Sequence, residues 1–514
     1  MKLTVLSTSD THGYLYPTNF RKRNQSLNFG LTKLVSEMRK IEKEKDIILL
    51  KIDNGDFLQG SPLSFYLEKN REAGSMADIM NQIGYDCGVL GNHEFNYGLQ
   101  FLEETIAKLN YPIVCANILK RSGEYFTGTP YTIFEKEGVK IAVLGLTTQY
   151  IPHWEKPEII EGLIFRSAVE TAKEFVPKLR EIADVVIVSY HGGFEKDLET
   201  GEATEVIIGE NEGYALLYEV EGIDVLLTGH QHRYIALNNE KISATQPGDK
   251  GKFIARVDVD YEEDLKKIIK THAELIKIGK QEEDFELRNR YLPLSNQVED
   301  WLDETLGKVE GNMKIEDTME ARMYGHPYIE FIQEVQKNAT GANISSTALF
   351  DDKAKGFSKE ISRRDIMTNY IYPSSLSVVS ISGEDLRLAI EKSACYFDRN
   401  TLNGRYSEND FSKDTIANFN YDLYSGVDYT IDTSRPKGER VTYLSYNEKE
   451  VLPEDRLEVV MSQYRAVGGG DYSMFNSEKI IKEISVDMVE LITEYLKNHP
   501  KIKAIQPTNF KLIK

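Results

Sequence analysis

Cysteine is scarce in this chain of 514 residues, which contains only Cys87, Cys115 and Cys395. The number is odd, and no two cysteines are spaced as a Cys-x-x-Cys pair. A disulfide framework needs more cysteines than this, and a thiolate zinc site needs them in closely spaced pairs. The sequence therefore excludes both.

Long apolar runs are also absent. No stretch approaches the roughly 18 consecutive apolar residues of a transmembrane helix. The N-terminus, MKLTVLSTSD, reaches polar residues by Ser7 and lacks the apolar segment of a signal peptide. We therefore expect no contact with a membrane and a cytoplasmic protein, or an exported one if a leader has been removed.

Basic residues are outnumbered by acidic ones. Lys and Arg total 62 against 82 Asp and Glu, which gives a net charge of −20. Such a charge repels a phosphate backbone, so the sequence predicts no nucleic-acid polymer as partner and disfavours an endonuclease on long nucleic acid. A small anionic substrate stays compatible with it, because bound metal cations can reverse the field inside one cleft.

Short β-branched runs are plentiful in the first 230 residues. They alternate with segments of helical period, such as Leu31, Leu34, Val35 and Met38. This alternation predicts α/β layers. The length predicts about two to four domains. The expected strands are 2–6, 47–52, 87–90, 141–146, 185–188 and 225–227.

The second half of the chain has a different pattern. From Glu262 a charged stretch, EEDLKKIIKTHAELIKIGKQEEDFE, favours helix. We expect a catalytic domain at 1–304, a helical connector or hinge at 305–325 and a second α/β domain at 326–514. In that domain we expect helices at 328–335 and 385–395, strands at 376–380, 429–431 and 457–460, and an exposed loop at 400–412.

Polar clusters follow five of the expected strands of the first domain. They are DTHG at 10–13, DNGD at 53–56, GNHE at 91–94, HGG at 191–193 and GHQH at 229–232. Strand ends in open α/β sheets converge on one crevice, so these groups should meet. A lone histidine after a strand is usually an ordinary loop residue, but five such clusters together favour a functional site.

These side chains suit metal ions. Carboxylate, amide and imidazole ligands without thiolate favour Mn, Zn, Fe or Co over Ca. Their number exceeds one coordination sphere, so the sequence predicts two divalent metal ions. The candidate ligands come from the five clusters.

The order of these motifs resembles the calcineurin-like metallophosphoesterases. Within them it is similar to the two-domain group of nucleotidases and 2′,3′-cyclic-nucleotide phosphodiesterases, whose loop after the second strand resembles QGSP at 59–62. The resemblance implies an N-terminal four-layer α/β/β/α sandwich and a C-terminal α/β substrate-binding domain. It further implies one metal on Asp10, His12, Asp53 and His232, a second on Asp53, Asn92, His191 and His230, and phosphoester hydrolysis.

His93 and Asn96 are the expected catalytic residues. The resemblance implies that His93 faces the leaving-group oxygen, as an acid or as a positive charge. Simple 5′-nucleotidases pair this histidine with an aspartate three residues later, whereas this chain has Asn96 in GNHEFNYGL. The asparagine-containing run resembles the cyclic phosphodiesterase and 3′-nucleotidase branch.

Aromatic residues of the second domain are candidates for base stacking, which tolerates any base. The resemblance implies Tyr372 and Tyr464, with Tyr421 and Tyr472 as alternatives; a tyrosine among β-branched residues is also common in a core. The glycine turn before Asp471 contributes Gly469 and Gly470, either for close approach of a nucleoside or simply for the turn. The phosphate-clamping Gly-Gly-Ile-Arg motif of 5′-nucleotidases is absent, and the chain instead reads SSTALF at 345–350.

We therefore predict a monomeric hydrolase that opens 2′,3′-cyclic nucleotides, removes the 3′-phosphate and closes its domains around the nucleotide. The alternatives are a 5′-nucleotidase or nucleotide-sugar hydrolase with the same metals, and a non-catalytic nucleotide-binding protein.

Overall fold

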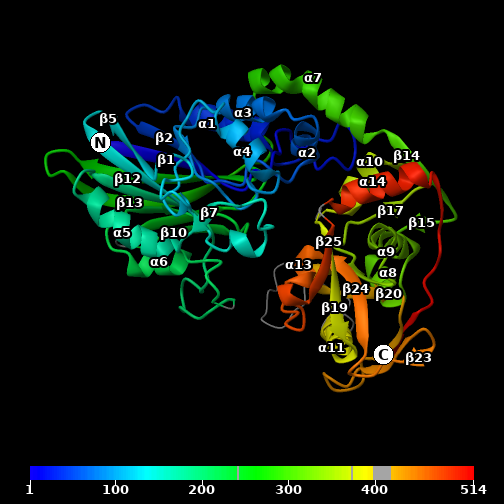
Figure 1. Cartoon of the computed structure of the whole chain (residues 1–514). Coiled ribbons are helices and arrows are strands. Elements are labelled where there is room, and N and C mark those ends of the chain that lie inside the picture. The colour runs from blue at the N-terminus through cyan, green and yellow to red at the C-terminus, as the bar shows by residue number, and fades with distance from the viewer. Residues whose placement is uncertain (206, 240–241, 372–373, 398–417, 485, 514) are drawn as a thin grey trace. The chain divides into compact units, whose positions relative to one another are not determined.

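The computed structural model describes residues 1–514 except 206, 240–241, 372–373, 398–417, 485 and 514. The chain divides into two compact units, Met1–Val298 and Glu299–Lys514. Each combines helices with β-sheet (Figure 1). The loop expected at 400–412 lies outside the described residues. Among the helices described, none has the length and apolar character needed to cross a membrane.

Two β-sheets form the centre of the first unit. One has the strand order β13-β12-β1-β2-β3 and the other β10-β11-β9-β8-β6-β5, while β4 and β7 form a separate pair. β1 runs parallel to β2 and antiparallel to β12. The strands are β1 (Lys2–Thr8), β2 (Ile48–Asp53), β3 (Cys87–Gly88), β4 (Ile118–Lys120), β5 (Tyr131–Lys136), β6 (Val139–Thr147), β7 (Leu163–Phe165), β8 (Val185–His191), β9 (Val225–Leu227), β10 (Tyr234–Asn238), β11 (Ser243–Pro247), β12 (Phe253–Glu262) and β13 (Lys267–Lys277).

The two sheets share one apolar layer. Val5 and Leu50 of the first sheet belong to the same buried cluster as Val143 and Ile187 of the second. The β-branched runs of the sequence are thus buried on both faces, as strands between two covering layers must be. All the strands expected in this half of the chain are present.

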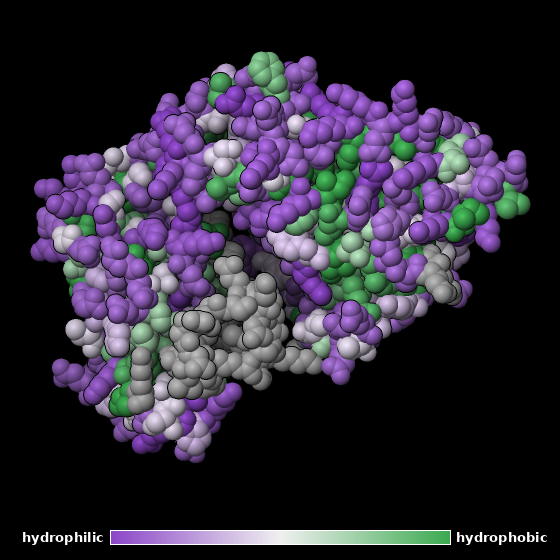
Figure 2. All heavy atoms as spheres, turned by 180° about the vertical axis from the view of Figure 1, so that it is seen from behind, coloured by the Kyte–Doolittle hydropathy of each residue, from purple (hydrophilic) through white to green (hydrophobic). Residues whose placement is uncertain are grey.

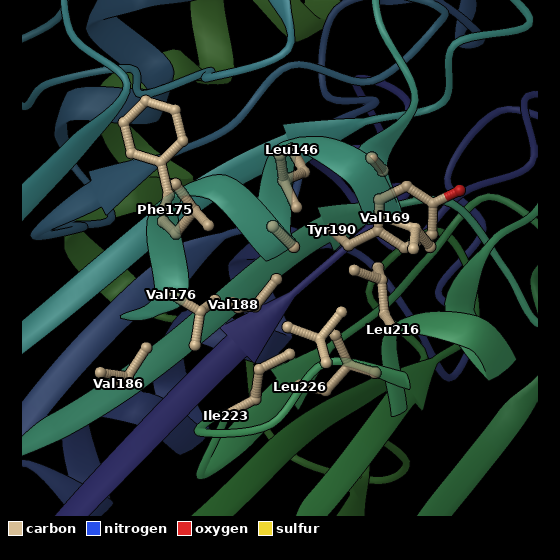
Figure 3. Packing of buried hydrophobic residues seen from close by; sticks show 14 of the residues in the cluster. Leu146, Val169, Phe175, Val176, Val186, Val188, Tyr190, Leu216, Ile223 and Leu226 are labelled. Atoms are coloured by element: carbon tan, nitrogen blue, oxygen red, sulfur yellow. The ribbon is translucent and has the colours of Figure 1, made fainter. Parts of the chain in front are cut away.

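Helices cover the outer faces of both sheets (Figure 1). Figure 3 shows Val169 and Val176 of α5 packed with Val186 and Val188 of β8 in a second buried cluster. The unit is therefore the expected four-layer α/β/β/α sandwich. Its helices are α1 (Leu31–Ile41), α2 (Pro62–Lys69), α3 (Ala73–Asn81), α4 (Gly98–Ile106), the 3₁₀ turn η1 (Ile151–His153), α5 (Ala168–Arg180), α6 (Gly213–Glu219) and α7 (Phe285–Leu302), which crosses the boundary between the units.

The charged stretch after Glu262 is not helical, which corrects the expectation. It forms β13, an edge strand paired antiparallel with β12 from Phe253 to Glu262. Lys and Glu favour helices only weakly, and pairing with a neighbouring strand outweighs that preference. Lysines at 267, 270 and 277 suit an edge strand because charge discourages pairing with another chain.

The second unit contains a mixed sheet of order β20-β16-β24-β19-β25 and a sheet of order β23-β22-β21-β27. Ile344, Val379, Leu386 and Tyr429 belong to its buried core. Its strands are β14 (Thr305–Glu310), β15 (Met313–Lys314), β16 (Ile344–Ala348), β17 (Gly356–Phe357), β18 (Glu360–Ser362), β19 (Leu376–Ser382), β20 (Asp422–Ser425), β21 (Asp428–Asp432), β22 (Val441–Tyr446), β23 (Lys449–Glu450), β24 (Arg456–Ser462), β25 (Ile480–Ile484), β26 (Lys501–Lys503) and β27 (Phe510–Ile513). Its helices are α8 (Thr318–Tyr324), α9 (Pro327–Thr340), α10 (Arg363–Asn369), α11 (Gly383–Ala394), η2 (Asn418–Asn420), α13 (Gln463–Ala466), η3 (Ser477–Lys479) and α14 (Met488–Asn498).

Residues 305–325 do not form the expected helical connector. They contain β14, β15 and α8, and β14 pairs with both β18 and β26 of the second unit. The segment is therefore part of that unit, and the helix at the boundary is α7. Sequence alone did not show this because the partners of β14 lie at 360–362 and 501–503. A hinge motion stays a prediction.

Hydrophilic residues cover much of the face shown in Figure 2, with smaller apolar areas between them. Hydrophobic residues make up 41% of the chain, and many of them are buried in the cores of the two units, which agrees with this surface.

We predict that Leu226→Ala destabilises the first unit by about 2–5 kcal/mol, because it leaves a cavity in the cluster beneath α5. Leu226 is fully buried there. The free energy of unfolding is measured by urea titration. Ile182→Ala is the control, because Ile182 is 46% exposed; equal losses for the two variants would contradict the prediction.

Candidate metal centre and catalytic site

The candidate ligands lie where strands of the first unit end. Asp10 follows β1, Asp56 follows β2, Asn92 follows β3, and His191 is the last residue of β8. Backbone strain marks the same places, because five non-glycine residues there have positive φ. They are Asp10, His12, Asp56, His230 and His232, with φ between 49° and 67°. Such conformations persist only where the surrounding structure holds them, and they concentrate at functional sites.

Asp10, His12 and His232 form the first cluster, with ligand atoms all within 4.8 Å of one another. His232 Nε2 lies 3.3 Å from Asp10 Oδ1 and 3.1 Å from His12 Nε2. His12 Nδ1 lies 2.8 Å from the carbonyl oxygen of Gln59 and donates to it, which leaves Nε2 as the ligand atom. Burial lowers the pKa of His12 to about 4, so this imidazole is neutral and able to bind a cation.

Asp56, His191 and His230 form the second cluster. His191 Nε2 lies 3.1 Å from Asp56 Oδ2 and 3.9 Å from Asp10 Oδ1, so Asp10 is close to both clusters. His191 Nδ1 lies 2.7 Å from the carbonyl oxygen of Asn54 and donates to it, which again leaves Nε2 as the ligand atom. Asn92 Oδ1 lies 2.9 Å from His230 Nδ1, so Asn92 adjoins this cluster as expected.

The two clusters fit two divalent cations. Asp56 Oδ2 and His191 Nε2 are both buried, lie 3.1 Å apart and have no other hydrogen-bond partner among the described residues. A proton on His191 can satisfy both atoms, and a cation between them can replace that proton. Nitrogen and oxygen ligands without sulfur agree with Mn, Zn, Fe or Co.

Asp56 takes the place that was expected for Asp53. In the described part of the chain, neither cluster includes Asp53, which is the last residue of β2 and pairs with Thr8 and Gly88 of its neighbours. Gly55, with φ of 87°, redirects the chain so that Asp56 reaches His191. The signal was present in the sequence, since Asp56 belongs to the same DNGD motif, but spacing did not show which carboxylate faces the histidines.

Glu94 is a further site residue that the sequence analysis did not assign. Its carboxylate accepts hydrogen bonds from the backbone N–H groups of Asp56, Phe57 and Leu58 at 2.8–3.0 Å. It also accepts one from Gly91 N–H. Glu94 therefore holds together the loops after β2 and β3, which carry Asp56 and His93.

His93 and Asn96 lie together beside the first cluster. The rings of His93 and His12 are 5.2 Å apart, and His93 Nδ1 donates to Asn96 Oδ1 at 2.6 Å. Asn96 Nδ2 in turn donates to Glu155 Oε1. Because Nδ1 is engaged, Nε2 is the nitrogen of His93 that is available to a substrate.

The candidate base-binding residues of the second unit differ in exposure. Tyr464 is 42% exposed, whereas Tyr421 and Tyr472 are buried. Their hydroxyls donate to the carbonyl oxygens of Arg322 and Asn420, which makes them core residues and removes both alternatives. Tyr372 lies outside the described residues.

The glycine turn supports the Tyr464 ring. A Cβ on Gly469 would lie 2.6 Å from atoms of that ring, so only glycine fits against it. Gly470 has φ of 73°, and Asp471 is exposed with φ of 63°. The buried guanidinium of Arg465 holds the turn, because it donates to Gly469 O and pairs with Asp422 at 2.8 Å. Packing of Tyr464 therefore explains Gly469 without a ligand.

Comparison with known proteins agrees with this geometry. Residues 3–234 match the family described as calcineurin-like phosphoesterase, and residues 307–477 match the 5′-nucleotidase C-terminal domain. The crystal structure of a putative 5′-nucleotidase from Staphylococcus aureus is 38% identical, with a TM-score of 0.91 and full coverage of both chains. This chain is a two-domain calcineurin-like phosphoesterase of the 5′-nucleotidase family.

Curated members of the family include a 2′,3′-cyclic-nucleotide 2′-phosphodiesterase/3′-nucleotidase from Salmonella typhimurium. It is 28% identical over 91% of this chain and 81% of its own length. A trifunctional nucleotide phosphoesterase from Bacillus subtilis is 26% identical over 96% of this chain, which spans only 38% of that relative. The fold class and the family resemblance are thereby confirmed, and the chain is a metallophosphoesterase.

We predict that Asp56→Asn weakens binding of divalent metal at least about tenfold, because it removes a ligand charge. Asp53→Asn is the matched control. Burial raises the pKa of Asp53 and repulsion from Glu94 raises it further, so an amide there replaces a carboxyl group whose negative charge is disfavoured. Metal content after dialysis and calorimetric titration measure the effect. If Asp53→Asn lost metal and Asp56→Asn kept it, Asp53 and not Asp56 would be the ligand.

We also predict that metal binding releases a proton from His191. Burial lowers the pKa of this imidazole, but the carboxylates of Asp56 and Asp10 outweigh burial and raise it to about 10. In the metal-free protein at pH 8 His191 is therefore protonated, whereas a metal ligand must be neutral, so metal affinity should rise with pH up to that pKa.

Calorimetry in two buffers of different ionisation enthalpy counts the released protons, and about one is expected from His191. The exposed His499 of the second unit provides the control variant His499→Gln, which should release the same number. A heat of binding that is independent of the buffer would contradict the prediction.

Proposed function

We propose that this enzyme hydrolyses 2′,3′-cyclic nucleotides and then removes the 3′-phosphate of the product. The observation that carries the proposal is the hydrogen bond from His93 Nδ1 to Asn96 at 2.6 Å, in a run that resembles the cyclic phosphodiesterase branch. The name of the Salmonella relative supports the same two activities.

The chain's own groups suggest how each step proceeds. When bound, two divalent cations would neutralise the phosphate oxygens and activate water for attack on phosphorus. His93 acts with both ring nitrogens protonated: Nδ1–H stays hydrogen-bonded to Asn96, and Nε2 gives its proton to the departing ribose oxygen, first the 2′-oxygen of the cyclic diester and then the 3′-oxygen of the monoester. The proton released by the attacking water restores the protonated ring after each step. Asn96 keeps the imidazole oriented during both steps. In the second unit, Tyr464 stays the candidate for base stacking, because its side chain is 42% exposed.

A 5′-nucleotidase is the second candidate, because the Staphylococcus aureus structure bears that name at 38% identity. It would use the same metal clusters. The two candidates differ in which ribose oxygen departs, so they are separated by substrate and not by metal dependence.

We predict that the metal-loaded enzyme turns over 2′,3′-cyclic AMP and 3′-AMP at least about tenfold faster than 5′-AMP or UDP-glucose. The measurement is kcat/KM for each substrate with Mn, Zn or Co. Preference for 5′-AMP would favour the second candidate. Tight binding without turnover under every metal would favour a non-catalytic protein.

His93→Ala separates catalysis from metal binding in the same assay. It should retain metal and lose about 100-fold in kcat, because proton transfer is lost while both clusters remain. Wild-type turnover by this variant would contradict the mechanism.

A further inference from the structure

Glu155 completes a chain of hydrogen bonds that begins at His93. His93 Nδ1 donates to Asn96 Oδ1 at 2.6 Å, and Asn96 Nδ2 donates to Glu155 Oε1. Glu155 is 59 residues from Asn96 in the sequence. No sequence motif includes Glu155, yet it is the next hydrogen-bonded group after the expected catalytic pair, His93 and Asn96.

The segment that carries Glu155 is anchored to the metal centre. It follows β6, and Thr148 N–H donates to the carbonyl oxygen of His191 at 2.9 Å. Ile151 is fully buried, and Glu155 N–H donates to its carbonyl oxygen at 3.0 Å. The ring of Trp154 lies 5.3 Å from that of His230. The position of Glu155 is therefore set by the same residues that set the ligands.

A carboxylate at this position decides which way the Asn96 amide points. An amide has a donor end and an acceptor end, whereas an ionised carboxylate only accepts. Glu155 therefore takes the NH₂ group, which turns Oδ1 toward His93. In its neutral form His93 must then carry its proton on Nδ1, so Nε2 is the nitrogen that takes up a second proton and gives it to a leaving group.

We propose that Glu155 is a positioning residue that orients His93 through Asn96 and fixes the tautomer of its imidazole. The role in catalysis rests on the proposed function, in which His93 gives a proton to the leaving group. A directly bound aspartate at position 96 would serve the same purpose with its own charge. In this chain the negative charge belongs to Glu155. The Asn96 amide lies between Glu155 and His93, and its orientation is set by Glu155.

The carboxylate also explains why position 96 holds an amide. An aspartate there would place a second carboxylate against Glu155, and two like charges at hydrogen-bond distance repel. Asn96 and Glu155 are thus a matched pair. The Glu155 carboxylate only accepts hydrogen bonds, and the Asn96 amide lies between it and His93.

The first experiment compares leaving groups. Glu155→Gln should lower kcat about tenfold on 2′,3′-cyclic AMP and diphenyl phosphate, whose leaving groups need a proton. It should lower kcat less than about twofold on bis(4-nitrophenyl) phosphate, whose leaving group departs without one. KM and metal content should not change. Glu158→Gln, at an exposed position of the same segment, is the control and should match the wild type.

A rescue experiment tests the pairing. Asn96→Asp should lower kcat on diphenyl phosphate about tenfold through repulsion with Glu155. The double variant Asn96→Asp/Glu155→Gln should recover most of this loss. In that variant the amide introduced at position 155 can donate to the carboxylate introduced at position 96, and this carboxylate still accepts from His93.

A spectroscopic experiment needs no substrate and no metal. In protein labelled with ¹⁵N-histidine, the His93 ring, assigned by loss of its signals in His93→Gln, should show a proton on Nδ1 in the wild type. Glu155→Gln should show both tautomers. A glutamine can donate or accept, so the Asn96 amide can rotate by 180° and present either Oδ1 or Nδ2 to His93.

These outcomes separate the inference from the proposed function. Equal losses on all leaving groups, no rescue, or an unchanged tautomer in Glu155→Gln would each overturn the role of Glu155. If the enzyme does not hydrolyse 2′,3′-cyclic AMP but the split between phenyl and nitrophenyl esters and the tautomer shift are observed, the proposed substrate is wrong and the positioning role stands.

Discussion

The carboxylate of Asp56 is the contact on which the site depends. One of its oxygens accepts the backbone N–H of His93 at 2.8 Å, and the other lies 3.1 Å from His191 Nε2. A single residue therefore connects the second ligand cluster to the loop of the catalytic histidine. The position of Asp56 also explains why residue 91 is a glycine, because a Cβ there would lie only 2.1 Å from Asp56 Oδ1.

Buried negative charge is the main electrostatic cost of this arrangement. Asp10, Asp53, Asp56 and Glu94 are all buried within the first unit. Burying carboxylates is costly unless positive charge or hydrogen bonds compensate them, and here imidazoles and backbone N–H groups do so in part. Divalent cations held by the two clusters would complete the compensation and would attract a phosphate. The net charge of −20 therefore says little about the substrate, because the local cations govern the site.

Local patterns of the sequence were sufficient for much of the first unit. The β-branched runs became buried strands, and the polar clusters after them converged, because both features depend on neighbouring residues. Segments whose secondary structure depends on pairing with another strand were predicted wrongly. The stretch after Glu262 became a strand because β12 pairs with it, and residues 305–325 joined a sheet whose other strands come much later. Tyr421 and Tyr472 could not be distinguished from Tyr464 until burial was known.

By itself, the sequence determined the α/β architecture, the family and five of the six members of the two ligand clusters found among the described residues, together with Asn92, because each rests on short motifs in a defined order. The tertiary structure decided which carboxylate of the DNGD motif meets His191: the chain turns at Gly55, whose φ is 87°, and Asp56 Oδ2 lies 3.1 Å from His191 Nε2. It also decided that Glu155 supports Asn96. Such a contact joins loops 59 residues apart, and only packing of the surrounding strands brings them within reach of a hydrogen bond.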